Sequence, residues 1–364
     1  MNAKRFSQPA KFFLLTLLAL TLLGWPNAQN TRSIVSAQTP TPDTYWPTGG
    51  WRTSTPEEQD LDSKYLSEML DAIKEQKLNL HSLLVIRHGY IVSETYAPSD
   101  GQDNKHELYS CTKSFISTLI GIALDQGLLD SLNRPVTGLF PESTFDNLDT
   151  LKKDMTVENL LTMTSGLGWE EGDTAYMGMY RSRDWVKYVM DLPMKVQPGT
   201  QFNYCTGCSH VLSAIIQKAT GAKSSDFAAK NLFKPLGISD VSWETDPSGI
   251  SFGGWGIRMT ARDMAKLGYL YLHQGKWDGQ QIVSTKWVET ATRKHVSTDN
   301  SLDYGYQWWI VPTLQAYAAL GRYGQTILVI PRLDMIVVTT AALENHDPIF
   351  ALIEGYVVPA VKQP

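Results

Sequence analysis

Apolar residues recur every three or four positions over residues 61–77, which predicts an amphipathic helix. Two short apolar runs follow, at residues 82–86 and 90–92, and a turn separates them, so we expect a β-hairpin there. A second apolar stretch, from Ser110 to Leu124, predicts a buried helix that ends at Gly127. The sequence therefore predicts a helix, a β-hairpin and a second helix, in this order, over residues 61–124.

The middle of the chain is predicted to be helical, and strands return only near its end. Residues 157–229 carry mostly helical periodicity with glycine-rich interruptions. The later strand signals lie at residues 306–311, 316–320, 327–330 and 335–340, and a closing helix is predicted over residues 349–358. Strands at both ends with helices between them predict one sheet assembled from both chain ends.

We therefore expect an α/β fold of the α+β sandwich type: an antiparallel sheet flanked by helices, with an inserted, mostly α-helical subdomain. The whole domain is predicted to span residues 59–362. Its sheet parts should lie at about 59–108 and 300–360, and its helical part at about 128–298.

The first residues have the features of a secretory signal peptide. Lys4, Arg5 and Lys11 precede an apolar run over residues 12–24, and small residues follow it. We expect a signal peptide over residues 1–28, with cleavage as late as residue 37, and hence a periplasmic or secreted protein. The alternative, an uncleaved anchor, is disfavoured because a membrane span needs about 20 apolar residues. No stable membrane span is expected after removal of the signal.

Residues 29–58 are rich in Thr, Pro, Ser and Asn and show little periodicity. They predict an irregular extension with little structure, either processed or wrapped along the surface. The folded domain is then expected to begin near residue 59.

The composition is that of a globular protein with no polyanionic partner. Of 364 residues, 43% are hydrophobic and 19% charged, which excludes wholesale disorder. The 32 basic and 37 acidic residues give a formal net charge of −5, so no nucleic-acid partner is expected.

Several catalytic motifs are missing from the sequence. It contains no His-Glu-x-x-His and no phosphate-binding loop ending in Lys-Ser or Lys-Thr. The histidines, at positions 81, 88, 106, 210, 273, 295 and 346, include no pair at metal-ligand spacing. We therefore expect no metal and no cofactor, and interpret each histidine as a surface or hydrogen-bonded structural residue.

A candidate nucleophile lies at the start of the predicted helix 110–124. Ser110 is the only serine followed three positions later by a lysine, Lys113, and this spacing places both side chains on one helix face. A serine hydroxyl needs a base, and a lysine serves as one only when part of its population is neutral. Burial and the positive end of the helix dipole both favour the neutral lysine. The Ser110 amide, at a helix N-terminus, can donate to an oxyanion.

Two further elements can border a cleft. Tyr204 follows the turn Gln197-Pro198-Gly199 and precedes the apolar helix 211–219, although a half-buried turn tyrosine is an equally ordinary interpretation. The run from Gly321 to Gln325 has glycines that let the backbone approach a ligand, or else form a bulge at a strand entry.

In this order, the three elements resemble the serine hydrolases of the beta-lactamase and penicillin-binding fold. The similarity is to the class C-like branch, which includes family VIII esterases and 6-aminohexanoate-dimer hydrolases. It covers residues 61–358, supported by residues 155–167, 232–238 and 259–268.

The resemblance implies an acyl-enzyme on Ser110, with Lys113 as its base and Tyr204 as the proton carrier. It also implies an oxyanion hole formed by the backbone amides of Ser110 and Gln325. The alternative within the same fold is a penicillin-binding-type sensor or wall-associated protein that is acylated with little turnover.

Two departures from the family pattern bear on the substrate. Tyr204-Cys205-Thr206 replaces Tyr-x-Asn, and Arg322-Tyr323-Gly324 replaces Lys-Thr-Gly. The first loses a carboxamide that helps to hold an acyl-amide side chain. The second loses groups that grip the carboxylate of a beta-lactam. Small esters or linear amides are therefore the expected substrates.

Aromatic residues suggest the walls of the binding site. They cluster at Trp169, Tyr176, Tyr180 and Trp185, with Trp255, Trp308 and Trp309 elsewhere. Core packing is the alternative for each of them. The residues predicted to bind substrate are Trp169, Tyr176, Tyr180, Arg322 and Tyr323.

The cysteines Cys111, Cys205 and Cys208 all lie beside candidate catalytic residues. An odd number cannot pair fully within one chain, and a single disulfide is left open. The Cys205-x-x-Cys208 spacing lacks the βαβ pattern that thioredoxin-like redox chemistry requires.

Overall fold

The computed structural model describes residues 45–362 of the chain. The helices are α1 (Ser63–Glu75), α2 (Thr112–Asp125), α3 (Thr150–Asp154), α4 (Val157–Leu161), α5 (Asp173–Arg181), α6 (Trp185–Met190), α7 (Thr206–Thr220), α8 (Ser224–Ala228), α9 (Ala261–Leu272), α10 (Thr285–Ala291) and α11 (Asp347–Leu352). The strands are β1 (Arg52–Thr53), β2 (Leu80–Arg87), β3 (Tyr90–Tyr96), β4 (His106–Glu107), β5 (Ser242–Trp243), β6 (Ile257–Met259), β7 (Lys276–Trp277), β8 (Gln280–Gln281), β9 (Val296–Ser297), β10 (Asp303–Tyr304), β11 (Trp309–Val311), β12 (Ala316–Gly321), β13 (Gln325–Ile330) and β14 (Met335–Ala341). The predicted signal peptide, residues 1–28, lies outside the described residues.

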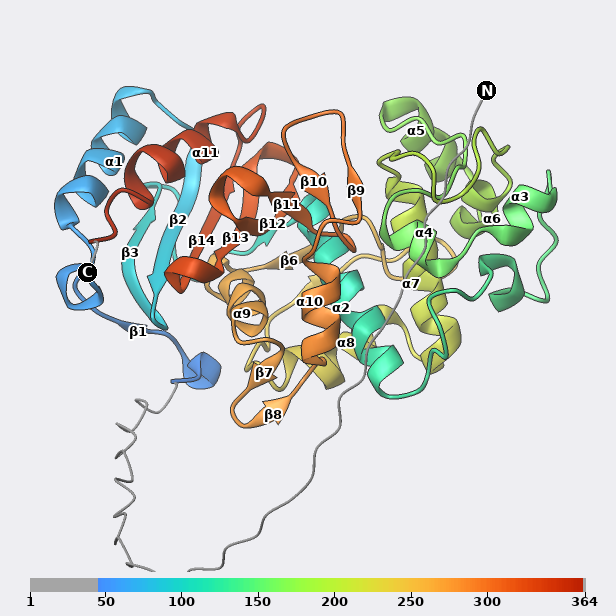
Figure 1. Ribbon diagram of the computed structural model, residues 1–364, viewed down its shortest axis with the longest axis horizontal. Helices are drawn as coiled ribbons and strands as arrows, with labels where there is room; N and C mark the ends of the chain where they lie inside the picture. Colours follow the sequence, from blue (N-terminus) through green and yellow to red (C-terminus); the bar gives the residue numbers. More distant parts are fainter. Residues whose placement is uncertain (1–44, 363–364) are drawn as a thin grey trace, which may run out of the picture. The chain divides into compact units, whose positions relative to one another are not determined.

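The main sheet joins strands from the two ends of the chain. Its order is β1-β3-β2-β14-β13-β12-β11-β10-β9, so the early hairpin lies directly beside the last strand (Figure 1). All of its pairings are antiparallel except that of β1 with β3. Val85 pairs with Val337, and Val337 pairs with Leu328 on its other side. The predicted antiparallel sheet built from both ends is confirmed, apart from the parallel edge strand.

Side-chain alternation along β14 explains why the sheet is covered on both faces. Val337 packs with residues of α1 and α11, whereas Ile336 and Val338 pack in a second cluster that includes α2 and α9. Successive strand residues point to opposite faces, so a strand buried on both faces is apolar along its whole length. Every residue of β14 is buried accordingly.

The helices α3 to α7 form a region beside the sheet, to the right in Figure 1. Between this region and the sheet runs α2, in which residues 112–123 are all buried. A short sheet of β4, β6 and β5 lies at the start of α2. This arrangement brings the N-terminus of α2 to the junction of the sheet and the helical region.

The structure differs from the sequence-based expectations in residues 45–58. That stretch was expected to have little structure, yet β1 pairs with β3, and Trp51 packs into the core and donates its indole N–H to Arg262 O at 2.9 Å. Trp46 packs against Tyr269 nearby. The two tryptophans supply apolar area that the average composition of the segment conceals.

The strand predicted over residues 306–311 begins only at Trp309. Gln307 has a positive φ of 59°, and its backbone N–H donates to Leu161 O at 3.1 Å instead of joining the sheet. The closing helix is also modified, because α11 gives way to a wider π-helical turn over residues 353–357.

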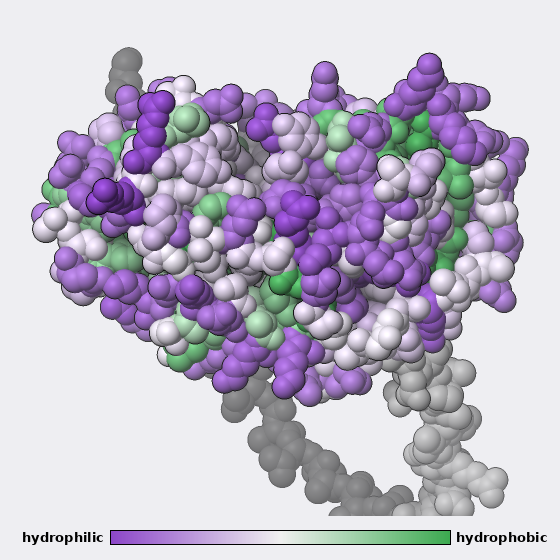
Figure 2. Space-filling view, turned by 180° about the vertical axis from the view of Figure 1, so that it is seen from behind, coloured by the Kyte–Doolittle hydropathy of each residue, from purple (hydrophilic) through white to green (hydrophobic). Residues whose placement is uncertain are grey.

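Among residues 45–362, no helix combines the length and apolarity needed to cross a bilayer. Figure 2 shows that the face turned away from Figure 1 is largely hydrophilic, with separated apolar patches.

Candidate active site

Ser110 lies in a 3-10 turn, Tyr109–Cys111, that leads directly into α2. Tyr109, just before it, has a positive φ of 46°, a conformation that non-glycine residues adopt only when their surroundings hold it. Glu107 provides that hold, because its carboxylate accepts from the N–H of Tyr109 at 3.2 Å and of Gly256 at 2.8 Å. Glu107 thereby links the turn that carries Ser110 to the segment around Gly256.

Lys113 follows Ser110 on the same face of α2 and is 1% exposed. Its ammonium nitrogen lies 2.9 Å from Ser110 Oγ, 3.1 Å from Thr206 Oγ1 and 3.0 Å from Gly254 O. Burial lowers the pKa of Lys113 to about 8, and the negative charge of Glu171 partly opposes this shift. A substantial neutral fraction therefore exists near pH 8.

Tyr204 lies just before α7, and its ring approaches Lys113 from the side of the helical region. Its ring centroid lies 4.9 Å from Lys113 Nζ, and the ring stacks on Trp309 at 5.7 Å. Burial raises the pKa of Tyr204 well above its ordinary value, and the interaction of its hydroxyl with Ser110 acts in the opposite direction. The phenol is therefore protonated near neutral pH.

Glu171 completes the network and was not predicted. Its carboxylate accepts from the backbone N–H of Thr206 at 3.0 Å, and also from the hydroxyls of Thr206 and Tyr176. Trp169 donates its indole N–H to the same carboxylate. No spacing rule connects Glu171 with Ser110, and Glu170 beside it is equally acidic, so only the tertiary fold distinguishes it.

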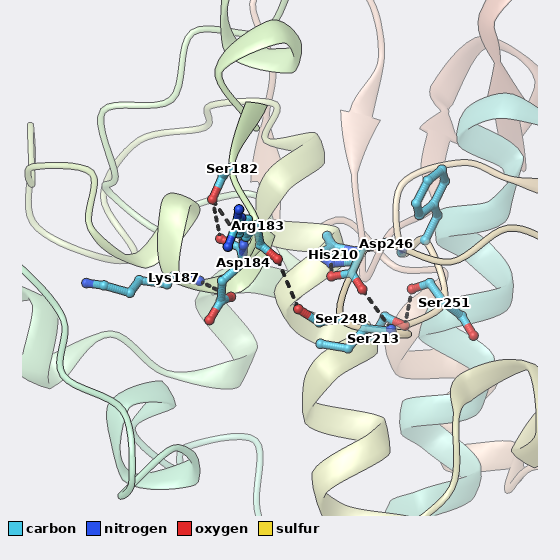
Figure 3. Close-up of polar contacts among 12 residues, drawn as sticks. Ser182, Arg183, Asp184, Lys187, His210, Ser213, Asp246, Ser248 and Ser251 are labelled. Atoms are coloured by element: carbon cyan, nitrogen blue, oxygen red, sulfur yellow. Dashed lines mark hydrogen bonds and ion pairs between the residues drawn. The ribbon is translucent and has the colours of Figure 1, made fainter. Parts of the chain in front are cut away.

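A buried histidine and aspartate hold the loop that carries Gly254. His210 Nε2 lies 3.0 Å from Asp246 Oδ2, and Figure 3 shows the two side chains facing each other. His210 Nδ1 accepts the N–H of Gly253 at 3.4 Å, so Nε2 is the ring nitrogen that donates to Asp246. A Cβ at Gly254 would meet Thr206 Cγ2 at 2.5 Å, which leaves room for glycine alone. The predicted structural role of His210 agrees with this position.

The cysteines divide into one pair and one free thiol. Cys205 and Cys208 form a disulfide between the N-cap residue and the first turn of α7. Cys111 is free and buried, and its Sγ lies 3.3 Å from Gln325 O. Burial raises the pKa of the Cys111 thiol far above its ordinary value, so this cysteine is an inert packing residue.

The cavity beside Ser110 has two lobes that share Ser110, Asp173, Tyr176 and Arg322. The aromatic lobe, of about 450 Å³, is further lined by Tyr109, Met177, Tyr180 and Trp255. The acidic lobe, of about 840 Å³, is further lined by Glu171, Asp347, Glu354 and Trp309. One lobe is thus mainly aromatic, and the other is lined by more acidic than basic side chains.

The predicted substrate-binding residues differ in where the structure places them. Tyr176 and Arg322 border both lobes, and Tyr180 borders the aromatic lobe. Trp169 is only 2% exposed, donates its indole N–H to Glu171, and lines neither lobe. Tyr323 is exposed and packs edge-on against Tyr109, outside the residues lining either lobe.

Gln325 is not brought to the cavity. It is 2% exposed and pairs with Gly321 in the sheet, and its side-chain amide donates to Ala341 O at 2.8 Å. The residues of this run that line the cavity lie instead at the end of β12 and just after it, at Leu320, Gly321 and Arg322. The close approach of the backbone to a ligand that we expected from the glycines of this run is therefore possible at Gly321, before Gln325.

Comparison with known proteins identifies the family of the chain. Residues 68–352 match the family described as Beta-lactamase. The chain is 26% identical over 298 residues to the 6-aminohexanoate-dimer hydrolase of Paenarthrobacter ureafaciens, covering 73% of each chain. It is 28% identical over 212 residues to esterase EstB of Burkholderia gladioli, covering 50% of this chain and 53% of that one. A family VIII carboxylesterase structure is similar with a TM-score of 0.66 at 17% identity, over 81% of this chain and 96% of the other.

Proposed function

The chain belongs to the beta-lactamase family and is a serine hydrolase, and from this premise we propose that it cleaves small esters or linear amides through an acyl-enzyme on Ser110. One observation carries the assignment: Lys113 Nζ lies 2.9 Å from Ser110 Oγ in a buried site that favours the neutral amine. Lys113 acts as the general base, and Tyr204 carries protons between the nucleophile, the leaving group and water.

The hydrogen bonds of Lys113 suit the neutral amine. A neutral amine has two N–H groups and one lone pair. The Gly254 carbonyl can only accept, and the single proton of the Thr206 hydroxyl goes to Glu171, so Thr206 can only accept from Lys113. Both N–H groups are then committed, and the lone pair is left to face the Ser110 hydroxyl. Glu171 therefore orients the base through Thr206, as a positioning residue.

The reaction proceeds in two halves. Lys113 takes the proton of Ser110 as Oγ attacks the carbonyl carbon, and the departing oxygen or nitrogen receives a proton through Tyr204, leaving an ester on Ser110. Water then loses a proton by the same route, attacks the ester, and the proton returns to Ser110 Oγ as the acid leaves. The raised pKa of Tyr204 fits a group that passes a proton on without remaining a phenolate.

The oxyanion of the tetrahedral intermediate requires backbone donors. The Ser110 amide, at the turn that opens α2, is the first of them. The predicted second donor, Gln325, is replaced in this proposal by the backbone at Gly321 and Arg322, because those residues border the cavity.

The two lobes support the substrate class. The aromatic lobe suits an apolar acyl or alcohol group. The acidic lobe is lined by four carboxylates, Glu171, Asp173, Asp347 and Glu354, which outnumber the single guanidinium of Arg322 and so oppose an anionic group. Beta-lactams carry a carboxylate, so we expect weak turnover of the chromogenic cephalosporin nitrocefin. Nitrocefin hydrolysis as fast as that of the best nitrophenyl ester would contradict this part of the proposal.

Export is part of the proposal and rests on the basic and apolar pattern of residues 1–28. Intact-mass analysis of the native protein recovered from the producing cells should give an N-terminus just after residue 28, or as late as residue 37. A native protein that retains Met1 would refute it.

The central experiment is labelling with a fluorophosphonate, followed by mapping of the modified residue. We expect one modified serine, Ser110. Steady release of nitrophenol after any initial burst identifies a hydrolase, whereas a stoichiometric burst that stops identifies the acylated sensor. Modification of another serine would refute the assignment.

A further inference from the structure

Three residues far apart in the sequence converge on the surface away from the network around Ser110. His81 lies on β2, Asp100 in the loop after β3, and His106 on β4. One potential ligand atom from each lies within 4.8 Å of the other two. His81 and His106 are 25 positions apart, so their spacing in the sequence does not mark them as a pair of metal ligands, and only the fold brings them together.

Asp100 is already oriented as a metal ligand would be. Its Oδ1 accepts the N–H of Gly101 at 2.9 Å, and its Oδ2 lies 2.9 Å from His106 Nε2. The Asp100 side chain is only 8% exposed. A carboxylate whose first oxygen is held by the backbone keeps the second oxygen in a fixed direction, as supporting hydrogen bonds do in known metal sites.

His81 supplies the third donor. Its ring centroid lies 5.3 Å from that of His106, and the two rings are tilted by 32°. Within residues 45–362, neither of its ring nitrogens has a hydrogen-bond partner. Its backbone is anchored, since the Ala97 N–H donates to His81 O at 2.8 Å. A nitrogen without a protein partner is therefore available on a fixed strand.

The surrounding charges permit a cation. The residues that line this hollow, of about 490 Å³, include Asp103 as well as Asp100. Of the two basic residues there, Lys105 is paired with Asp240 at 2.6 Å. Arg258, on β6, lies opposite Glu107 of β4 in the strand register. Among the residues that line the hollow, it is the basic residue left to oppose binding of a cation.

We propose that His81, Asp100 and His106 bind a divalent metal ion of the zinc class. Two imidazoles and one carboxylate are ligands for zinc or cobalt, whereas magnesium and calcium prefer oxygen alone. Ligand atoms of a tetrahedral zinc site lie about 3.4 Å apart, so small side-chain adjustments close the site. Water would take the fourth position.

The bound ion would act as a clamp. It would fasten the loop around Asp100 and the strand β4 to β2, and β4 leads directly to the turn that carries Ser110. We expect it to stabilise the protein, because an ion that binds only the folded state raises the free energy of unfolding. This inference does not depend on the acyl-enzyme chemistry.

The test uses the metal-free full chain with ZnCl2, CoCl2 or MgCl2. At a zinc concentration about 100 times Kd, Tm should rise by about 5 °C. Cobalt should give the visible absorption bands of a four-coordinate nitrogen and oxygen site, and magnesium should have no effect. Wild-type protein without a zinc-dependent shift and without cobalt bands would overturn the proposal.

Two variants assign the ligands. His81→Ala and Asp100→Asn should each weaken zinc binding by at least about 100-fold and remove the cobalt bands. His88→Asn is the matched control, since His88 lies at the β2–β3 turn outside the cluster, and it should bind as the wild type does. Zinc affinity unchanged in the His81 variant would place the ion elsewhere and overturn the proposal.

Discussion

The hydrogen-bonded network beneath Ser110 and the cavity above it are built in opposite ways. In the network, Lys113 is 1% exposed and has three fixed partners, one of which Glu171 orients in turn. The cavity is bordered by side chains such as Tyr180, which is 49% exposed. Changes in the network should therefore act on the chemical step, and changes in the cavity should act on substrate choice.

The largest effect is expected from removing the nucleophile. Ser110→Ala should lower ester turnover by at least about 10⁴-fold while leaving the thermal transition in place, because the hydroxyl adds little to packing. The measurement is kcat with a nitrophenyl ester, together with circular dichroism. Ser301→Ala, at the rim of the acidic lobe, is the control and should retain kcat within a few fold. Comparable losses in both variants would remove the distinction between network and cavity.

The second effect comes from the base. Lys113→Ala should lower kcat by about 10² to 10⁴-fold, because a positioned general base contributes that much. Lys152→Ala removes an equally buried lysine that bonds Asp146 O outside the site. It should lower stability without a matching loss of kcat. Wild-type kcat in the Lys113 variant would mean that another group accepts the proton.

The pH profile tests the electrostatics of the network. In the proposed mechanism the base is neutral Lys113, so kcat/KM should rise with pH and reach half its plateau near pH 8. The groups that face Lys113 are Ser110, Thr206, the Gly254 carbonyl, Tyr204, Cys111 and, through its charge, Glu171. Tyr204 adds no step near neutrality because its pKa is raised.

Glu171→Gln sharpens that test. The carboxylate favours the charged lysine, so its removal should move the midpoint to lower pH. The amide can also donate to Thr206 and reverse its hydroxyl, so kcat at the plateau should fall by about tenfold or more. Thr206→Ser keeps the hydroxyl and should retain the wild-type midpoint. A midpoint that rises in the Glu171 variant would refute the electrostatic argument.

The sequence could predict which catalytic candidates lie together when they are a few positions apart. Contacts between residues that are distant in the sequence could be found only in the structure. Ser110 and Lys113 are three positions apart, one in the 3-10 turn and the other in the first turn of α2, so local helical geometry juxtaposes them. Glu171 meets Thr206 across 35 positions, and no pattern marks it. Gln325 lies within the sheet and does not line the cavity, because the register of β12 with β13 decides which residues reach it.

The same distinction holds for the fold. Alternation and apolar runs located the strands β2, β12, β13 and β14, because a buried strand needs apolar side chains over its whole length. They could not find β1, whose pairing depends on Trp51 packing far from its own segment. Composition averages over such single anchoring residues.

The smallest effect should come from the cavity wall. Tyr180 borders the aromatic lobe, and its exposure means that its removal disturbs little packing. Tyr180→Ala should raise KM for nitrophenyl hexanoate by about three- to tenfold and leave kcat within about twofold, since a loss of contacts shared by substrate and transition state changes KM alone. Tyr323→Ala is the matched control, because Tyr323 is 38% exposed but lies outside both lobes. A fall in kcat with unchanged KM in the Tyr180 variant would show that the wall takes part in the chemical step, and the separation between network and cavity would fail at that residue.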